Sequence, residues 1–401
     1  MLSWSFALAV LALVALPPLV PRALRPATHA ALSALGLLLV WQVPLGAVGV
    51  ACLGVWAAGR LLPRCPPPVR GPLLAFAVTA VVAGFVWLKT GAHGVWGQAV
   101  SPPAGWGQAA GGPAAGAIVG LSYFTLKFVQ HLVDAAAGRA AHVGLVDFVC
   151  CILFLPTFAA GPIERSDTFA RQLAALAPSA DDRVQGLERI VFGLGKKLLL
   201  GDPLLRYALP VFADPGAATP AATLLAVYAY AVGLYLDFAA YSDMAIGAGR
   251  AAGLRIRENF DRPYLQPDIA ALWQHWHMSF TGWLRDFVFL PVTRRTLRAT
   301  GHALGSQVTG QLVTMTLCGL WHGFAWHFAL WGLYHGVGLA GLALWRRWRG
   351  KAPAAPWRRG LATLATFHFF AFGLVLFAND LPGTARVFGR LLGLGHLVGL
   401  R

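Results

Sequence analysis

Stretches without a single charged side chain constrain this sequence more than any other feature. A helix needs about 20 such apolar residues to cross the ~30 Å hydrocarbon core of a membrane. Only 12% of the residues are charged and 57% are apolar, whereas a soluble protein carries about a quarter charged residues. We therefore expect an all-α polytopic membrane protein with roughly nine to eleven transmembrane helices. The clearest uncharged stretches are residues 1–21, 71–88, 215–236, 303–345 and 361–378.

The positive charge is spread over short connectors between the apolar segments. The formal net charge is +16, but the basic residues form no single groove-like patch, which argues against a nucleic-acid partner. Short basic connectors mark the cytoplasmic face of a membrane protein, so we expect residues 60–70 and 346–359 to be cytoplasmic. If residues 30–41 and 45–58 form two short helices broken at Pro44, the amino terminus and the uncharged stretch 90–113 are extracytoplasmic. The first apolar segment lacks the positively charged n-region of a signal peptide. This favours an uncleaved signal anchor in the cell membrane over a cleaved signal peptide.

The sequence contains neither an internal repeat of fixed period nor a charged low-complexity tail. We expect one membrane-embedded domain over residues 1–401, with N-terminal spans over 1–119, a core over 120–380 and a C-terminal helix over 381–401. The evenly charged stretch 165–197 is expected to form helices at the membrane surface. The five cysteines are odd in number and show no paired C-x-x-C spacing, so neither a disulfide framework nor a zinc site is expected.

The segment 255–298 is dense in charged and aromatic residues, although it lies between two apolar spans. We interpret residues 273–285 as one helix with an aromatic stripe about 120° wide. An amphipathic helix of this kind lies in a membrane interface or lines a protein interior. The residues of the stripe are Trp273, Trp276, His277, Phe280, Trp283 and Leu284. The residues expected to face elsewhere are Gln274, His275, Ser279, Gly282 and Asp286.

His322 is a candidate for acid–base chemistry. It lies in the sequence Leu-Trp-His-Gly, at the middle of the longest charge-free window. Two spans of ~20 residues would place it near their junction. Ionisable residues at membrane depth are costly and usually mark function, and a neutral imidazole can accept a proton from a hydroxyl near neutral pH. On this feature alone, a hydrogen-bonded structural histidine is an equal alternative.

The same argument for acid–base chemistry applies more weakly to His277, because a histidine among tryptophans is also typical of a packed core. His275 and His277 lie two apart on the expected helix and point to different faces, so they cannot share a metal ion. We expect no metal site. The sequence also has no P-loop, no dinucleotide-binding fingerprint and no G-x-S-x-G serine elbow, so nothing favours a covalent serine mechanism.

Two carboxylates follow an uncharged run of spanning length. Asp237 and Asp243 suggest either a polar lining or ion-pair partners for Arg255 or Arg285, and we favour structural pairing over catalysis. Three further histidines lie in apolar surroundings without a local partner, and we expect them to be structural. These are His327, His335 and His368.

Several motifs occur in order between residues 120 and 380. They are GLSYFT at 120–125, PTFAAGPI at 156–163, DFAAYSD at 237–243, ENFDRPY at 258–264, WQHWHMS at 273–279, WLRDF at 283–287 and GLWHG at 319–323. Together they resemble the membrane-bound O-acyltransferases. More narrowly, they resemble the bacterial branch that holds the alginate O-acetylation and teichoic-acid D-alanylation proteins.

This resemblance implies a ring of tilted helices around a central funnel, with a histidine near its base. The near-invariant histidine of the family falls on His322, and its second recurrent polar residue falls on His277. In that branch the acyl group arrives on a cytoplasmic thioester, and a hydroxyl acceptor approaches from outside. The resemblance also implies an extracytoplasmic partner protein that completes the transfer in some systems.

The motif details are mixed between the two kinds of relative. After residue 292 the chain reads Thr-Arg-Arg, where alginate-type members usually carry a Gly-Gly-Asn-Arg stretch. Met278 and Ser279 are typical of the D-alanylation proteins, whereas Tyr264 and residues 367–370 are typical of the alginate type. The acyl group and the acceptor are therefore left open by the sequence.

We expect transfer of a short acyl group, acetyl first, from a thioester to a hydroxyl of an extracytoplasmic polysaccharide. The co-substrate would be acetyl-CoA or an acyl-carrier protein, without a bound cofactor. His322, as general base, and His277 are the expected catalytic residues, while His277, Asn259 or Arg285 would orient the donor or stabilise the oxyanion. D-alanyl transfer to a cell-wall polymer is one alternative; a transporter is another, although it predicts inverted repeats that we do not find. The residues expected to bind substrate are Trp276, Trp321, Asn259, Arg285 and Asp243.

Overall fold

The computed structural model describes residues 12–13, 20–21, 24–41, 43–90, 120–349 and 356–395. Within these ranges every regular element is helical. Five of the helices are long and apolar enough to cross a membrane, which confirms a helical membrane protein. They are Leu45–Arg64, Pro67–Thr90, Pro220–Ala251, Trp326–Arg349 and Trp357–Ala378.

Part of the expected topology lies outside the described residues. Most of the first span at 1–21, nearly all of the uncharged stretch 90–113 and residues 350–355 of the second basic connector are in this group. The orientation in the membrane and the total number of spans therefore stay predictions.

The described chain forms two compact units. The first takes its residues from Met1–Pro103, Ala114–Gly193 and Tyr241–Glu258. The second takes its described residues from Leu194–Ala240 and Asn259–Arg401. The long helix α11 (Pro220–Ala251) contributes to both, because the division falls within it.

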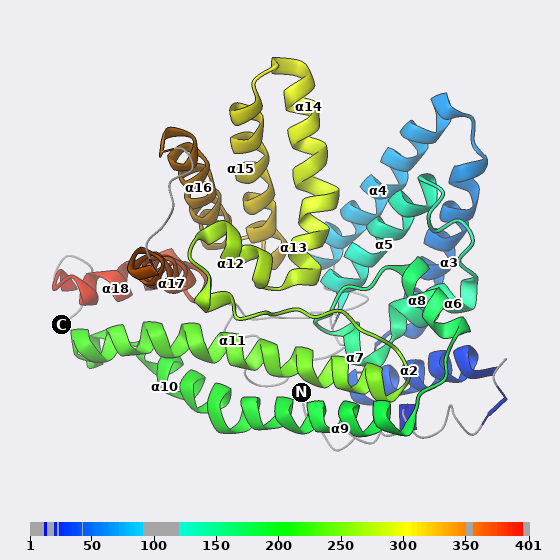
Figure 1. Cartoon of the computed structure of the whole chain (residues 1–401), viewed down its shortest axis with the longest axis horizontal. Helices are drawn as coiled ribbons and strands as arrows, with labels where there is room; N and C mark the ends of the chain where they lie inside the picture. The colour runs from blue at the N-terminus through cyan, green and yellow to red at the C-terminus, as the bar shows by residue number, and fades with distance from the viewer. Residues whose placement is uncertain are drawn as a thin grey trace. The chain divides into compact units, whose positions relative to one another are not determined.

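The first unit begins with two helices that are separated at a proline. α2 (Arg25–Trp41) ends before Pro44, which directly precedes α3 (Leu45–Leu61), as predicted. A short 3-10 turn, η3 (Leu62–Arg64), leads into α4 (Pro67–Thr90), whose apolar side chains are largely exposed, as on a helix that faces lipid. The remaining helices of this unit are α5 (Leu121–Ala136), α6 (Leu145–Leu153), α7 (Leu155–Phe158), α8 (Ser166–Ala174) and α9 (Ala180–Gly195) (Figure 1).

The evenly charged stretch 165–197 forms α8 and α9, which confirms the helical part of that prediction. α9 runs beside the last turns of α11 (Figure 1). A side-chain carbon at Gly186 would collide with the backbone of Gly247, and the reverse holds as well. Two glycines thus allow the two helices to approach backbone to backbone.

The second unit holds most of the remaining helices. After a π-helical turn η4 (Lys196–Gly201) come α10 (Asp202–Ala213), the 3-10 turn η5 (Pro215–Ala217) and α11. The segment after α11 contains η6 (Pro263–Leu265), α12 (Ile269–His275), α13 (Met278–Leu284) and the π-helical turn η7 (Arg285–Phe289). The unit ends with α14 (Leu290–Thr300), α15 (Ala303–His322), α16 (Trp326–Arg349), α17 (Pro356–Ala378) and α18 (Leu381–Leu391).

The longest charge-free window folds into the helical pair α15 and α16, which lie side by side (Figure 1). A side-chain carbon at Gly319 would collide with the backbone oxygen of Phe328, and one at Gly332 with that of Met315. The two backbones therefore touch near the turn that joins the helices. His322 is the last residue of α15, at the junction that the sequence predicted.

The prediction of one helix over residues 273–285 is wrong. α12 ends at His275 and α13 begins at Met278, because His277 adopts a left-handed backbone conformation with φ 44° and ψ 52°. Non-glycine residues adopt this conformation rarely, and neither a glycine nor a proline marks the break. The backbone N–H of Met278 donates to the backbone oxygen of Asn259 (2.8 Å) instead of continuing a helix.

The aromatic stripe itself is nevertheless largely buried. Trp283 is half-buried, and the other five members are buried. Ser279 was expected to face elsewhere, and this is wrong, since its side chain is buried. The break at His277 rotates α13 relative to an uninterrupted helix, which explains the error.

Candidate functional site

His322 lies at the C-terminal end of α15 and is half-buried among aromatic rings. Its ring centroid lies 4.8 Å from that of Trp321, 4.9 Å from that of Phe377 and 5.4 Å from that of Trp331. All three neighbours meet it edge to face. The imidazole is thus held by packing while part of it stays accessible, which is what a general base that receives a proton from a substrate requires.

The last position of the Leu-Trp-His-Gly motif, Gly323, has no room for a side chain. Its backbone is extended, and a side-chain carbon there would collide with the ring of Phe328. Phe328 stacks near His322, with centroids 6.3 Å apart. A larger residue at this position would displace Phe328 and with it one wall around the histidine.

His277 is buried in the turn between α12 and α13, with 3% of its surface exposed. Its ring packs against Phe238 and Phe280, at centroid distances of 4.7 and 5.1 Å. Burial lowers the pKa of His277 well below its ordinary value, and the neighbouring His322 lowers it further. His277 is therefore a neutral imidazole at neutral pH, close enough to His322 to interact with it electrostatically.

Asn259 is fully buried and fixes the start of α13. Its side-chain oxygen accepts a hydrogen bond from the hydroxyl of Ser279 (2.7 Å), and its backbone oxygen accepts one from Met278 N–H (2.8 Å). These bonds hold the two residues that follow His277 and so stabilise its unusual backbone conformation. The arrangement makes Asn259 a support of His277, and direct contact with a substrate stays a prediction.

The two predicted tryptophans lie in the same unit as the histidines. Trp276 is buried against Phe260, Tyr264 and Phe370, with centroids 5.2, 5.8 and 4.8 Å away. Trp321 is half-buried and packs on Phe280 at 4.4 Å. Both therefore build the aromatic surroundings of the histidines, and the structure does not test whether either binds substrate.

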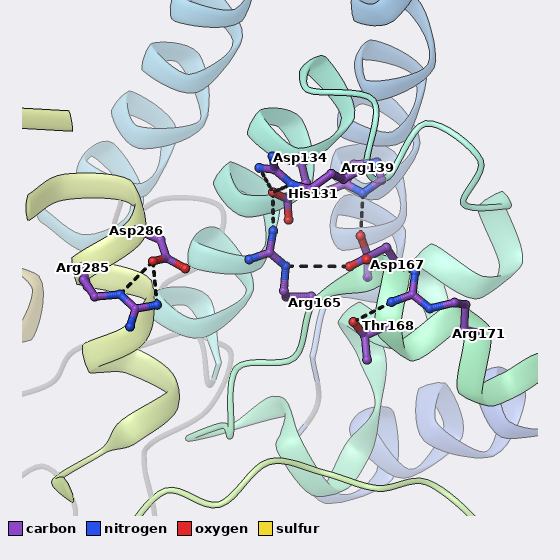
Figure 2. Close-up of polar contacts among 10 residues, drawn as sticks. His131, Asp134, Arg139, Arg165, Asp167, Thr168, Arg171, Arg285 and Asp286 are labelled. Atoms are coloured by element: carbon purple, nitrogen blue, oxygen red, sulfur yellow. Dashed lines mark hydrogen bonds and ion pairs between the residues drawn. The ribbon is translucent and has the colours of Figure 1, made fainter. Parts of the chain in front are cut away.

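Arg285 is not part of this aromatic group. Its side chain is 65% exposed and pairs with the adjacent Asp286, with N–O distances of 2.9 Å (Figure 2). An exposed arginine in an ion pair is a weak candidate for an oxyanion donor, because such a donor acts best where water is excluded.

Asp243 belongs to the first unit and lies in an ion-pair network. Arg189 pairs with Asp243 at 3.0 Å and with both oxygens of Glu258. The expectation of structural pairing is confirmed, but the predicted partners are wrong: Arg255 pairs with Asp182 at 2.6 Å, and Arg285 with its neighbour. Asp237 likewise pairs with Lys197 at 2.6 Å, in the second unit.

The structure adds residues to the site that the sequence analysis did not assign to it. Trp331 and Phe377 contact His322 from α16 and α17. Trp331 lies nine residues after His322, and the sequence indicated only that Trp331-Gly332 is typical of the alginate-type relatives, without assigning it to the site. Among the described residues no group of three or more histidine, cysteine or acidic side chains is arranged to hold a metal ion.

Comparison with known proteins decides the family. The model of the membrane-bound O-acyltransferase family matches residues 69–377. The chain belongs to this family. That match confirms the resemblance of the motifs at 120–323 and includes both His277 and His322.

Curated relatives come from three groups. A probable alginate O-acetylase of Azotobacter vinelandii is 35% identical over 55% of this chain and 44% of its own length. The teichoic acid D-alanyltransferase of Bacillus subtilis is 30% identical over 65% of this chain and 68% of its own. The peptidoglycan O-acetyltransferase of Helicobacter pylori is 25% identical over 62% of this chain and 47% of its own. The chain spans about half the length of the alginate O-acetylases that it matches.

Proposed function

We propose that this protein transfers a short acyl group, acetyl first, from a cytoplasmic thioester to a hydroxyl of an extracytoplasmic polysaccharide. The observation that carries the proposal is the placement of His322 at the junction of α15 and α16, half-buried among aromatic rings and next to neutral His277. The family match supports an acyltransferase over the alternative of a transporter.

His322 acts as general base. It takes the proton of the acceptor hydroxyl while that oxygen attacks the thioester carbonyl carbon. The carbon–sulfur bond then breaks, and the departing thiolate receives the proton from His322. The products are an ester and a free thiol, and no acyl-enzyme forms.

His277 is the best candidate to stabilise the carbonyl oxygen as it gains negative charge. A neutral imidazole in a water-poor site can donate one hydrogen bond, and donors of this kind contribute most where water is excluded. Of the three residues considered for this role, Arg285 is exposed and ion-paired, and Asn259 supports the turn through Ser279. We favour His277 because it lies close enough to His322 to interact with it electrostatically.

The relatives support a polymer acceptor without fixing the acyl group. Their names describe acetylation of alginate, acetylation of peptidoglycan and D-alanylation of teichoic acid. Acetyl transfer from acetyl-CoA is our first choice, and D-alanyl transfer from a carrier protein is the second. An extracytoplasmic partner protein completes the transfer in some systems of this branch.

Purified protein in proteoliposomes tests the proposal. Acetyl-CoA or a D-alanyl carrier protein is supplied together with alginate or teichoic acid, and thiol release and polymer-bound ester are measured. Thiol release above that of empty liposomes supports acyl transfer, and the donor that is consumed identifies the acyl group. If the folded protein consumes neither thioester with any acceptor, the proposal is overturned.

A further inference from the structure

Three side chains near His322 form a buried group that we call the indole–imidazole cluster: Trp273 of α12 and Trp331 and His335 of α16. Their ring centroids lie 5.0 to 6.0 Å apart. Exposed fractions are 5%, 3% and 0%. Trp331 also meets His322 edge to face at 5.4 Å, so the cluster adjoins the proposed general base.

The polar atoms of this cluster have no hydrogen-bond partner among the residues that the structure describes. These atoms are the indole N–H groups of Trp273 and Trp331 and both ring nitrogens of His335. Leaving a buried donor or acceptor unpaired costs about 1–3 kcal/mol, and buried polar groups in proteins are nearly always paired. Four such atoms in adjoining rings indicate a group that comes from outside the chain.

Two half-buried tyrosines of the same unit, by contrast, have partners in the backbone. The hydroxyl of Tyr334 donates to the backbone oxygen of Phe369 (2.7 Å), and that of Tyr264 donates to the backbone oxygen of Ala231 (2.7 Å). The chain thus supplies partners to these two tyrosine hydroxyls, whereas it supplies none among the described residues to the nitrogens of the cluster.

The cluster lies along a line that leads to His322. α12 and α16 are in contact, and two pairs of residues show that they run antiparallel. Asp268, before α12, pairs with Arg346 near the end of α16 (2.8 Å), and Trp273 meets His335 at 5.3 Å. His335 lies about 16 Å along the helix from Arg346, so the cluster is between the basic end of α16 and His322.

We propose that the indole–imidazole cluster binds an amide group on the arm of the acyl donor while the thioester carbonyl lies at His322. This inference rests on the proposed function. The arms of acetyl-CoA and of carrier-protein thioesters share amide groups near the sulfur. An amide oxygen accepts two hydrogen bonds and its N–H donates one; the cluster offers indole donors and an imidazole that both donates and accepts.

Two features favour the donor over the polysaccharide as the guest. Full burial suits a thin, flexible arm better than a chain of sugar rings. The cluster also lies on the side of His322 that faces the basic end of α16, and this end belongs to the connector expected on the cytoplasmic side, where the thioester enters.

The replacement His335→Phe tests this assignment, because it keeps an aromatic ring and removes both nitrogens. In the donor-free protein the Tm should stay the same or rise, since deleting an unpaired buried polar group removes a cost. KM for a donor with an amide should increase roughly 2- to 12-fold, the worth of one hydrogen bond, with kcat little changed. Trp273→Phe should raise the same KM.

Two small donors separate an amide site from a general packing effect. S-acetyl-N-acetylcysteamine carries one amide, whereas S-butyl thioacetate carries none. We expect His335→Phe to raise KM only for the first. His368→Phe is the matched control, because Nδ1–H of His368 on α17 already donates to the backbone oxygen of Leu364 (2.7 Å), and it should change neither KM.

The outcomes are distinct. Turnover of either small donor by the natural protein supports the proposed function whatever the variants do. A lower Tm of His335→Phe, or an equal KM increase for both donors, overturns the amide site and leaves the proposed function intact. Absence of thioester consumption by the natural protein overturns both.

Discussion

Two buried clusters of this protein treat their polar groups in opposite ways. In the first unit the carboxylate of Asp134, 2% exposed, accepts hydrogen bonds from Arg139 (2.6 Å) and Arg165 (2.5 Å) (Figure 2). In the second unit the indole–imidazole cluster is equally buried, and its nitrogens have no partner among the described residues. A cluster whose polar groups pair with one another stabilises the fold, whereas a cluster whose polar groups have no such partner is suited to bind a ligand.

The largest expected effect is the loss of the paired cluster. Asp134→Ala removes the carboxylate that two arginines share, one of them the mostly buried Arg165. Breaking a buried pair by removing one partner costs roughly 3–5 kcal/mol, and we expect the lower end, because Arg139 is half exposed. Thermal unfolding in detergent measures the loss.

Asp286→Ala is the control for that comparison. It breaks the exposed pair with Arg285, and exposed pairs contribute about 0–1 kcal/mol. Equal losses of stability in the two variants would show that burial does not distinguish the paired cluster.

A second prediction concerns the left-handed residue at the site. His277→Asn removes the imidazole, while asparagine tolerates this backbone conformation better than most residues. We expect the Tm to change little and the rate per folded molecule to fall roughly 100-fold, as for loss of an oxyanion donor. If activity falls only in proportion to the amount of folded protein, His277 has a structural role and none in catalysis.

A third prediction tests the support of that residue. Ser279→Ala removes the hydroxyl donor to the side-chain oxygen of buried Asn259 but keeps the longer bond from the backbone N–H (3.4 Å), so it should cost about 0.5–1.5 kcal/mol. Gln274→Ala, at an exposed position of α12, should stay within about 0.5 kcal/mol. Chemical denaturation of both variants measures the change in the free energy of unfolding. If Ser279→Ala leaves it unchanged, the bond to Asn259 does not support the turn at His277.

The smallest effect is expected at Glu164, a buried carboxylate whose loss of hydration is only partly offset by its contacts. Burial raises the pKa of Glu164, although it accepts a hydrogen bond from the backbone N–H of Arg257 (2.8 Å). A raised folded pKa means that stability is fully present below the unfolded pKa of roughly 4.3 and is lost as pH rises through the folded value. Glu164→Gln removes this loss.

Unfolding as a function of pH measures that prediction. The stability of Glu164→Gln relative to the natural protein should grow from about pH 4 toward neutral. A relative stability that is independent of pH would show that the contacts of Glu164 fully offset its burial.

The sequence predicted most of the helical frame because apolar length and proline breaks are local signals. The break at Pro44 and the junction at His322 both followed from such signals. The break at His277 did not, because it depends on hydrogen bonds from the distant Asn259. Local pattern thus placed the elements and missed a turn that tertiary contacts impose.

Polar partners show the same division. The pairing of Asp243 was expected, but its partner Arg189 lies 54 residues away and cannot be chosen from sequence spacing. His335 was expected to be structural because it lies in an uncharged helix. Its unusual feature is the lack of a partner for either nitrogen among the described residues, and only a structure reveals that.

The most direct test of the account is the rate of acyl transfer by His322→Ala, measured per folded molecule beside the natural protein. His327→Ala is the control, five residues away and buried in the same helical pair. Loss of a general base costs roughly 10²- to 10⁴-fold in rate, so His322→Ala should lose that much at an unchanged Tm, and His327→Ala much less. Near-normal acyl transfer by folded His322→Ala would contradict the central claim.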